Sequence, residues 1–114
     1  MKLNALTVIV ASLLVNLPTF TQTDSTVTNF FKNLVGTWQI ENSQRYEIWS
    51  NDAGSFSAKG ITIVNEDTLV NETVTISFEK NKIYYVAEVK NQNAGKPIKF
   101  ILTHCAKNKL VFVN

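Results

Sequence analysis

Two glutamates on predicted strands are the residues of this 114-residue chain best suited to acid–base chemistry or to anchoring a polar group. Glu72 falls on the apolar face of its strand, in step with Val70, Val74, Ile76 and Phe78. An unpaired carboxylate there is costly, so its pKa should rise unless a cation such as Arg45 lies near. Two interpretations stay open: Glu72 and Glu47 line a polar interior, or Glu72 lies solvated at the rim.

Other catalytic and metal-binding chemistry finds little support in the sequence. One histidine and one cysteine are too few for a typical transition-metal site. His104 and Cys105 are strand neighbours that point to opposite faces, which excludes a nucleophile–base pair without a bulge. We expect His104 on the face of Phe100 and Leu102, as a core histidine. No phosphate loop or nucleophile elbow occurs, and we expect no cofactor and no metal.

Four aromatic residues are suited to line a pocket on the same predicted faces. They are Trp38, Trp49, Phe100 and Phe112. With Glu47 and Glu72 as polar anchors, they predict a site for a small, partly apolar ligand. Plain packing of the four rings in a core explains the same positions equally well, and both interpretations stay open.

The elements that position these residues follow from hydrophobic periodicity. Apolar residues from Val27 to Leu34 recur at spacings of three and four, which predicts a short helix that ends at Gly36. After Gly36 the period is two. The predicted strands span residues 36–42, 44–50, 55–64, 69–79, 82–90, 97–105 and 109–113.

Seven short strands joined by asparagine-rich turns predict an all-β domain. No connection is long enough for a crossover helix, so neighbouring strands should be antiparallel. We therefore predict an antiparallel, up-and-down barrel or half-barrel with a short N-terminal helical turn. The last strand should present an unpaired edge, from which we expect that the natural chain continues past Asn114 and that this edge promotes dimerisation or aggregation.

The first 21 residues have the features of an export signal. Lys2 supplies the positive charge, residues 5–15 are uncharged and mostly apolar, and Pro18 precedes a predicted cleavage site before Gln22. The apolar run is too short to span a membrane. The predicted organisation is a signal peptide at 1–21, a helical lead-in at 22–35 and a β domain at 36–114. We expect a periplasmic or secreted protein without a stable membrane anchor.

Charge is nearly balanced, with 11 basic and 9 acidic residues. Acidic residues gather between positions 41 and 79, and lysines follow from Lys80 onward. Pairing of early with late strands is the favoured interpretation, and a basic surface for an anionic partner is the alternative. Nucleic acid is not expected as a partner, because the basic residues are nearly balanced by acidic ones and the chain has little net positive charge.

Several short motifs run through the predicted β domain. They are Gly36-Thr37-Trp38, Glu47-Ile48-Trp49, Gly54 with Gly60, Glu72, and the segment from Gly95 through Pro97 to Phe100. This pattern resembles an uncharacterised family of small bacterial exported lipocalin-like (calycin-like) domains over nearly the whole chain after the signal. The resemblance implies a lipocalin-like barrel but no activity. Val113 replaces an acidic residue of the family's Phe-Glu-Asn, and its His-Asp-Phe-Pro segment and an arginine soon after Gly60 are missing.

Three functions are compatible with these features. The first is an exported binding module for a small, partly apolar ligand, and the alternative is a structural or protein-interaction domain with a filled core. An enzyme that uses Glu47 or Glu72 as acid or base ranks third, because no supporting constellation is visible. A co-purifying ligand, an exposed apolar patch and a pH-dependent turnover would favour the first, second and third function respectively.

Overall fold

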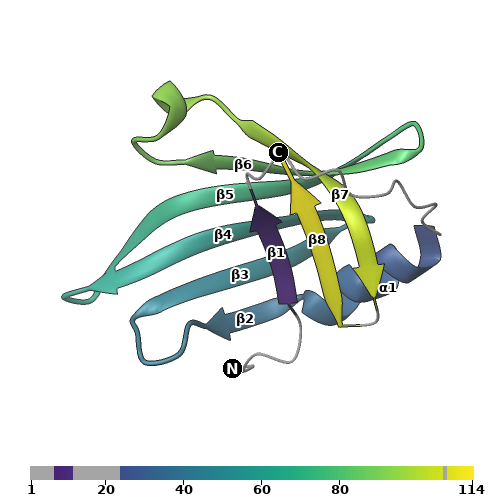
Figure 1. Cartoon of the computed structure of the whole chain (residues 1–114). Coiled ribbons are helices and arrows are strands. Elements are labelled where there is room, and N and C mark those ends of the chain that lie inside the picture. Colours follow the sequence, from purple (N-terminus) through teal and green to yellow (C-terminus); the bar gives the residue numbers. More distant parts are fainter. Residues whose placement is uncertain (1–6, 12–23, 107) are drawn as a thin grey trace.

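The computed structural model describes residues 7–11, 24–106 and 108–114. These residues form one α-helix, a short 3₁₀ turn and a single eight-stranded sheet (Figure 1). In chain order the elements are β1 (Thr7–Ala11), α1 (Asp24–Leu34), β2 (Gly36–Gln39), β3 (Arg45–Asp52), β4 (Ser55–Val64), β5 (Asp67–Glu79), β6 (Lys82–Val89), the 3₁₀ turn (Asn93–Gly95), β7 (Ile98–Ala106) and β8 (Lys109–Val113).

Strands β2 to β8 form an antiparallel, up-and-down meander that curls into a half-barrel. Each strand pairs with the next one in the chain, and the predicted fold class and helix are confirmed. The connections use the predicted asparagines: Asn42, Asn65 and Asn91 all adopt left-handed backbone, with φ of 57°, 49° and 63°. Asparagine tolerates this conformation, which lets short turns reverse the chain between strands.

Strand β1 bears on the expectation about the sheet edge. It pairs in parallel with β8, from Thr7 opposite Lys109 to Ala11 opposite Val113. In the unprocessed chain the outer edge of β8 is therefore paired with residues of the predicted signal peptide, and an unpaired edge in the mature domain stays a prediction. The residues of β1 belong to the predicted signal peptide, whose predicted cleavage site before Gln22 lies outside the described residues.

Helix α1 packs its apolar side against one end of the concave face of the sheet. Val27, Phe30, Phe31 and Leu34 are buried, as the periodicity predicted. The Phe31 ring lies 5.6 Å from the Trp49 ring and 5.5 Å from the Phe56 ring, measured between centroids. Among the described residues, no helix has the length and apolar character needed to cross a membrane.

A bulge in β5 changes which residues share a face with Glu72. Gly60 of β4 pairs with Glu72, but the next residue, Ile61, pairs with Val70, so Asn71 is the extra residue. Adjacent residues of β4 point to opposite faces, which places Val70 and Glu72 on opposite sides of the sheet. The prediction that the two share an apolar face is wrong, and Val70 is exposed. The Asn71 amide donates a hydrogen bond to the Thr62 hydroxyl.

A second irregularity corrects the prediction for His104. Leu102 pairs with Phe112, and His104 pairs with Val111, so the extra residue in β7 is Thr103. His104 is thereby turned to the exposed outer side, away from the face of Phe100 and Leu102. Cys105 takes the inward position opposite Leu110 and packs partly against the core, as a small apolar side chain would.

Candidate functional site

One row of paired residues crosses the concave face beyond the part that α1 covers. Trp38 pairs with Glu47, Glu47 with Gly60, and Gly60 with Glu72. Paired residues of neighbouring strands point to the same side of a sheet, so both carboxylates lie on the concave face with Gly60 between them. The sequence had left open whether Glu47 and Glu72 line the interior or Glu72 lies at the rim, and it had not predicted that they share one row.

Gly60 leaves room for the Glu72 side chain to lean toward Glu47. A Cβ atom built on Gly60 would lie 3.4 Å from Glu72 Cβ and 3.7 Å from Glu72 Oε2. The Glu72 carboxylate therefore lies over the glycine, in the direction of the strand that carries Glu47. The absent side chain at position 60 lets two acidic groups on β3 and β5 approach each other across β4.

Glu72 is a half-buried carboxylate without a direct partner among the described residues. Burial raises its pKa most strongly, and the Glu47 charge raises it further. The Arg45 charge lowers the Glu72 pKa, but this effect is smaller than the other two. Within the described residues Arg45 is exposed and makes no ion pair with Glu72, so the predicted structural pair is not formed. The Glu72 side chain is therefore neither fully solvated nor paired with a cation.

The two tryptophans use their indole N–H groups differently. Trp49 Nε1 donates to Glu47 Oε2 at 3.5 Å, which is long for a hydrogen bond. Trp38 Nε1 donates to the Leu34 carbonyl at 2.6 Å and so satisfies one of the last carbonyls of α1. Trp38 therefore anchors the helix, whereas the indole N–H of Trp49 points from the core toward the Glu47 carboxylate.

Tyr85 is a member of this region that the sequence analysis missed. It pairs with Ile76 and Phe100 on the concave face, and only 6% of its surface is exposed. Its pKa is raised by burial and by the charges of Glu72 and Glu47, which places the phenol in the field of both carboxylates. No described residue makes a hydrogen bond with its hydroxyl. The sequence signal that could have pointed to Tyr85 is a tyrosine at an inward position of a strand whose other inward residues are apolar.

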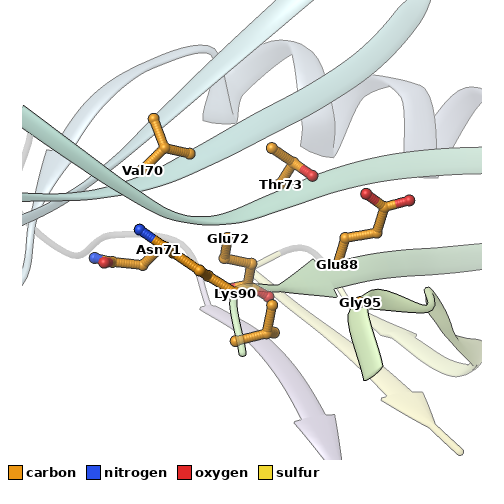
Figure 2. A pocket seen from close by; sticks show the side chains of 8 residues that line it. Val70, Asn71, Glu72, Thr73, Glu88, Lys90 and Gly95 are labelled. Atoms are coloured by element: carbon orange, nitrogen blue, oxygen red, sulfur yellow. The ribbon is translucent and has the colours of Figure 1, made fainter. Parts of the chain in front are cut away.

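Glu72 borders two hollows at this end of the sheet. A cavity of about 50 Å³ is bordered by Arg45, Glu47, Gly60 and Glu72, together with apolar and amide side chains. A shallower groove of about 250 Å³ lies between β5, β6 and the 3₁₀ turn (Figure 2). In Figure 2, Glu72 lies on the other side of the β5 ribbon from Val70 and Thr73.

The four predicted aromatic residues all lie on the concave side. Trp38, Trp49 and Phe112 are buried in the core, and Phe100 is partly buried against it. The Phe100 and Phe112 rings both contact Tyr85, with centroid distances of 6.3 Å and 5.5 Å. The core-packing interpretation therefore describes three of the four rings, and their contact with a ligand stays a prediction.

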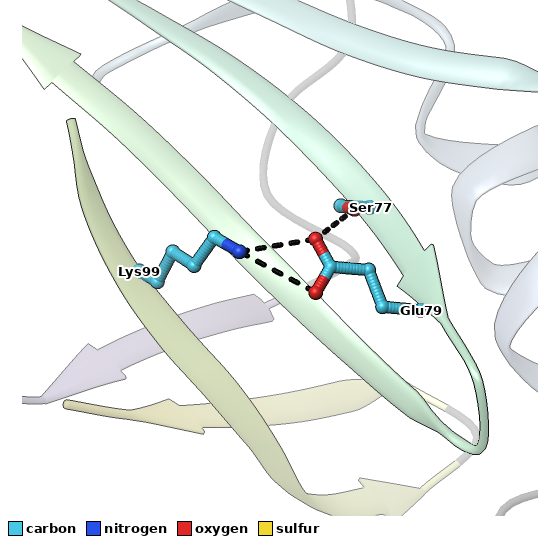
Figure 3. A network of polar contacts seen from close by, with 3 residues as sticks. All are labelled: Ser77, Glu79 and Lys99. Atoms are coloured by element: carbon cyan, nitrogen blue, oxygen red, sulfur yellow. Dashed lines mark hydrogen bonds and ion pairs between the residues drawn. The ribbon is translucent and has the colours of Figure 1, made fainter.

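Glu79, at the other end of β5, shows what a well-partnered carboxylate looks like in this protein. Lys99 Nζ lies 3.0 Å from Glu79 Oε1, and the Ser77 hydroxyl donates to the same oxygen at 3.1 Å (Figure 3). These contacts lower the Glu79 pKa, with the Lys99 hydrogen bond as the largest cause. This exposed pair joins an early acidic residue to a late lysine, as the charge distribution predicted.

The described residues contain no cluster of three or more histidine, cysteine, aspartate or glutamate side chains that could hold a metal ion. Comparisons with models of known protein families, with curated proteins and with solved structures found no match to this chain. The resemblance to lipocalin-like domains therefore stays a prediction.

Proposed function

We propose that this protein is a binding module for a small, partly apolar ligand, which enters the concave face at the end that α1 leaves uncovered. Glu47 and Glu72 anchor the polar part of the ligand, and Trp49 and Phe100 contact its apolar part. The observation that carries this proposal is the half-buried Glu72 carboxylate, which lacks a partner among the described residues and borders a cavity.

The cost of that carboxylate is the physical argument for a ligand. A partly buried carboxylate that lacks a partner lowers the stability of a fold, and a role in binding or catalysis is one reason for which such a group is retained. Gly60 adds a second indication, because a larger residue there would fill the space over which Glu72 lies. The small volume of the neighbouring hollows indicates a ligand below drug size.

The two tryptophans offer a direct test, because they are the only ones in the chain. Trp38→Phe leaves Trp49, whose N–H points to Glu47, as the sole fluorophore of the polar end. Trp49→Phe leaves Trp38 as a matched reporter bonded to α1. A ligand in the proposed site should change the emission of both tryptophans, because Trp38 pairs directly with Glu47 and the Trp49 N–H points to the same carboxylate. No change at either reporter for any ligand extracted from the purified protein would contradict the proposal.

A second candidate function is protein interaction through the β4–β5 hairpin. Four apolar residues near its turn are exposed, each by 36–45% of its surface: Ile63, Val64, Leu69 and Val70. The hairpin projects beyond the neighbouring strands in Figure 1. Concentration-dependent association that Leu69→Lys abolishes, together with silent tryptophan reporters, would favour this function over ligand binding.

We also propose that the protein is exported, on the basis of the signal features at residues 1–21. Mass spectrometry of protein from the native host should find a mature N-terminus near Gln22. Recovery of intact residues 1–21 in a cytoplasmic pool would exclude export.

A further inference from the structure

We propose that this protein associates head to tail, with the acidic tip of the β4–β5 hairpin of one copy held in a basic hollow at the β5–β6 turn of the next copy. The acidic tip is residues 64–67. The basic hollow is bordered by Glu79, Lys80, Asn81, Lys82 and Tyr84. This inference rests on the second candidate function, interaction through the β4–β5 hairpin, and specifies its partner. It does not depend on ligand binding at the concave face.

The two surfaces lie at opposite ends of the longest strand. β5 runs from Asp67, in the acidic tip, to Glu79, at the border of the basic hollow. In Figure 1 the β4–β5 and β5–β6 turns lie on opposite sides of the molecule. A strand of 13 residues, with a rise of about 3.3 Å per residue, separates its ends by roughly 40 Å. The tip and the hollow of one molecule therefore cannot meet, and a contact between them requires two copies.

The acidic tip carries negative charge that the described part of the chain does not neutralise. Glu66 and Asp67 are the only charged residues between Thr62 and Val70, and both are exposed. Neither makes an ion pair with a described residue. Arg45 lies at the base of the hairpin, paired with Thr62, and makes no described ion pair with either of them. Both charges are available to a partner, for which a basic surface is the complement.

The basic hollow supplies the opposite charge. Lys80 and Lys82 are exposed at its border, and neither makes an ion pair with a described residue. Lys99 already pairs with Glu79 at 3.0 Å, so these two charges cancel and the other two lysines set the sign (Figure 3). The hollow has a volume of about 470 Å³, which exceeds the volume of either hollow that Glu72 borders. It therefore has both the charge and the room for the side chains of the acidic tip.

Exposed apolar side chains flank the acidic tip. They are Ile63, Val64, Leu69 and Val70. Successive residues of a strand point to opposite faces, so these four residues lie on both sides of the hairpin. At the β5–β6 turn, Phe78 is 43% exposed and the Tyr84 ring borders the hollow. A contact that covers such side chains gains hydrophobic stabilisation, whereas the charges decide which surfaces meet.

The proposed contact is heterologous, because the tip and the hollow are different surfaces of the same chain. Each copy that binds through its tip leaves its own hollow free for another copy. Contacts of this kind build a ring where the rotation between copies closes, and an open filament where it does not. Association should therefore depend on both ends of β5 in every copy, which makes it testable by changing one end at a time.

The decisive experiment reverses the charge of one surface at a time in the full chain. One variant carries Glu66→Lys with Asp67→Lys, and the other carries Lys80→Glu with Lys82→Glu. Sedimentation at about 0.01 M salt measures the average mass as protein concentration increases. The wild-type chain should associate, each variant alone should stay monomeric, and an equimolar mixture should associate again, because each tip then meets a hollow of opposite charge. A monomeric wild-type chain, or a mixture that stays monomeric, would overturn the proposal.

Two further variants separate the contact from net charge and from folding. Lys32→Glu with Lys59→Glu makes the same change in net charge on exposed positions outside both surfaces, and it should leave association unchanged. Glu66 has left-handed backbone, with φ of 71°, and follows Asn65 at 49°. Asn-Gly is the preferred sequence for such a turn, so Glu66→Gly should keep the hairpin folded and still weaken association severalfold. Loss of association in the lysine control, or unchanged association in Glu66→Gly, would overturn the proposal.

Salt distinguishes this contact from apolar association through the same hairpin. At about 1 M salt the Debye length falls to about 3 Å, so association through exposed charges should be lost. Association that persists there, or that both charge-reversed variants retain, would overturn the head-to-tail assignment. If Leu69→Lys abolished such salt-resistant association, the hairpin interaction of the second candidate function would survive with a different partner surface.

Discussion

Helix α1 places Phe31 against Trp49 and Phe56 at one end of the concave face, while at the other end the same face carries Glu47 and Glu72. At the helix end the Trp38 N–H has a short bond to the Leu34 carbonyl. At the open end the Glu72 carboxylate has no hydrogen-bond partner among the described residues. The strands alternate in the same way at both ends. What differs is the cover, because an inward row becomes core where a helix seals it and becomes a candidate site where none does.

The largest effect on stability should come from the removal of a buried side chain at the helix end. Phe31 is fully buried, so Phe31→Ala should lower the free energy of unfolding by about 3 to 5 kcal/mol through lost burial and a cavity. Phe78→Ala is the matched control, because this ring is 43% exposed, and it should cost less than about 1 kcal/mol. Denaturant melts followed by circular dichroism measure both. Similar losses would mean that α1 does not seal the core as described.

A smaller difference should separate the two tryptophans. Trp38→Phe and Trp49→Phe remove the same volume from buried positions, but only Trp38 loses a short hydrogen bond to a helix carbonyl. Trp38→Phe should therefore be the more destabilising by about 1 kcal/mol. Urea melts of both variants test this order. The reverse order would show that the contact between Trp49 and Glu47 is the stronger one.

At the open end we expect Glu72→Gln to increase the free energy of unfolding, whereas the substitutions at the helix end decrease it. The folded-state pKa of Glu72 is raised, so the folded protein binds this proton more readily than the unfolded chain, and stability falls as pH rises through the range above 4.5. Glu72→Gln should raise the free energy of unfolding at pH 7 by about 0.5 kcal/mol, a modest gain because solvent screens the half-exposed group. The variant should also lose this pH dependence. Destabilisation would indicate a partner for the carboxylate.

Glu79→Gln is the control, because the contribution of Glu79 to stability changes with pH in the opposite direction to that of Glu72. The Glu79 pKa is lowered by Lys99 and Ser77, so its contribution is present above pH 4.5 and is lost as pH falls below that value. The variant should flatten the acid side of the stability profile, whereas Glu72→Gln flattens the side above pH 4.5. Stability measured from pH 3 to pH 8 distinguishes the two carboxylates, and identical profiles would refute the assigned difference.

The smallest effect on stability is expected for Gly60→Ala. The new methyl group would meet Glu72 at ordinary contact distances, and Gly60 does not adopt left-handed backbone. The free energy of unfolding should change by less than about 0.5 kcal/mol. Because the methyl group occupies the space below the Glu72 carboxylate, affinity for a ligand that binds this carboxylate should fall even so. A large loss of stability, or unchanged affinity, would remove Gly60 from the description of the site.

The sequence by itself determined most of the local structure of this protein. The helix and the seven meander strands follow from periodicity and turn residues, which act over a few neighbouring positions. Only the tertiary structure decided how faces and edges combine. Extra residues at Asn71 and Thr103 turned Val70 and His104 outward, and β1 covered the edge of β8. The tertiary structure also left Arg45 and Glu72 at one cavity without an ion pair between them, and it buried Tyr85 between Ile76 and Phe100. These features depend on bulges, which change the face of the residues beyond them, and on pairing and packing between parts of the chain that are distant in sequence, so the local alternation of residues does not determine them.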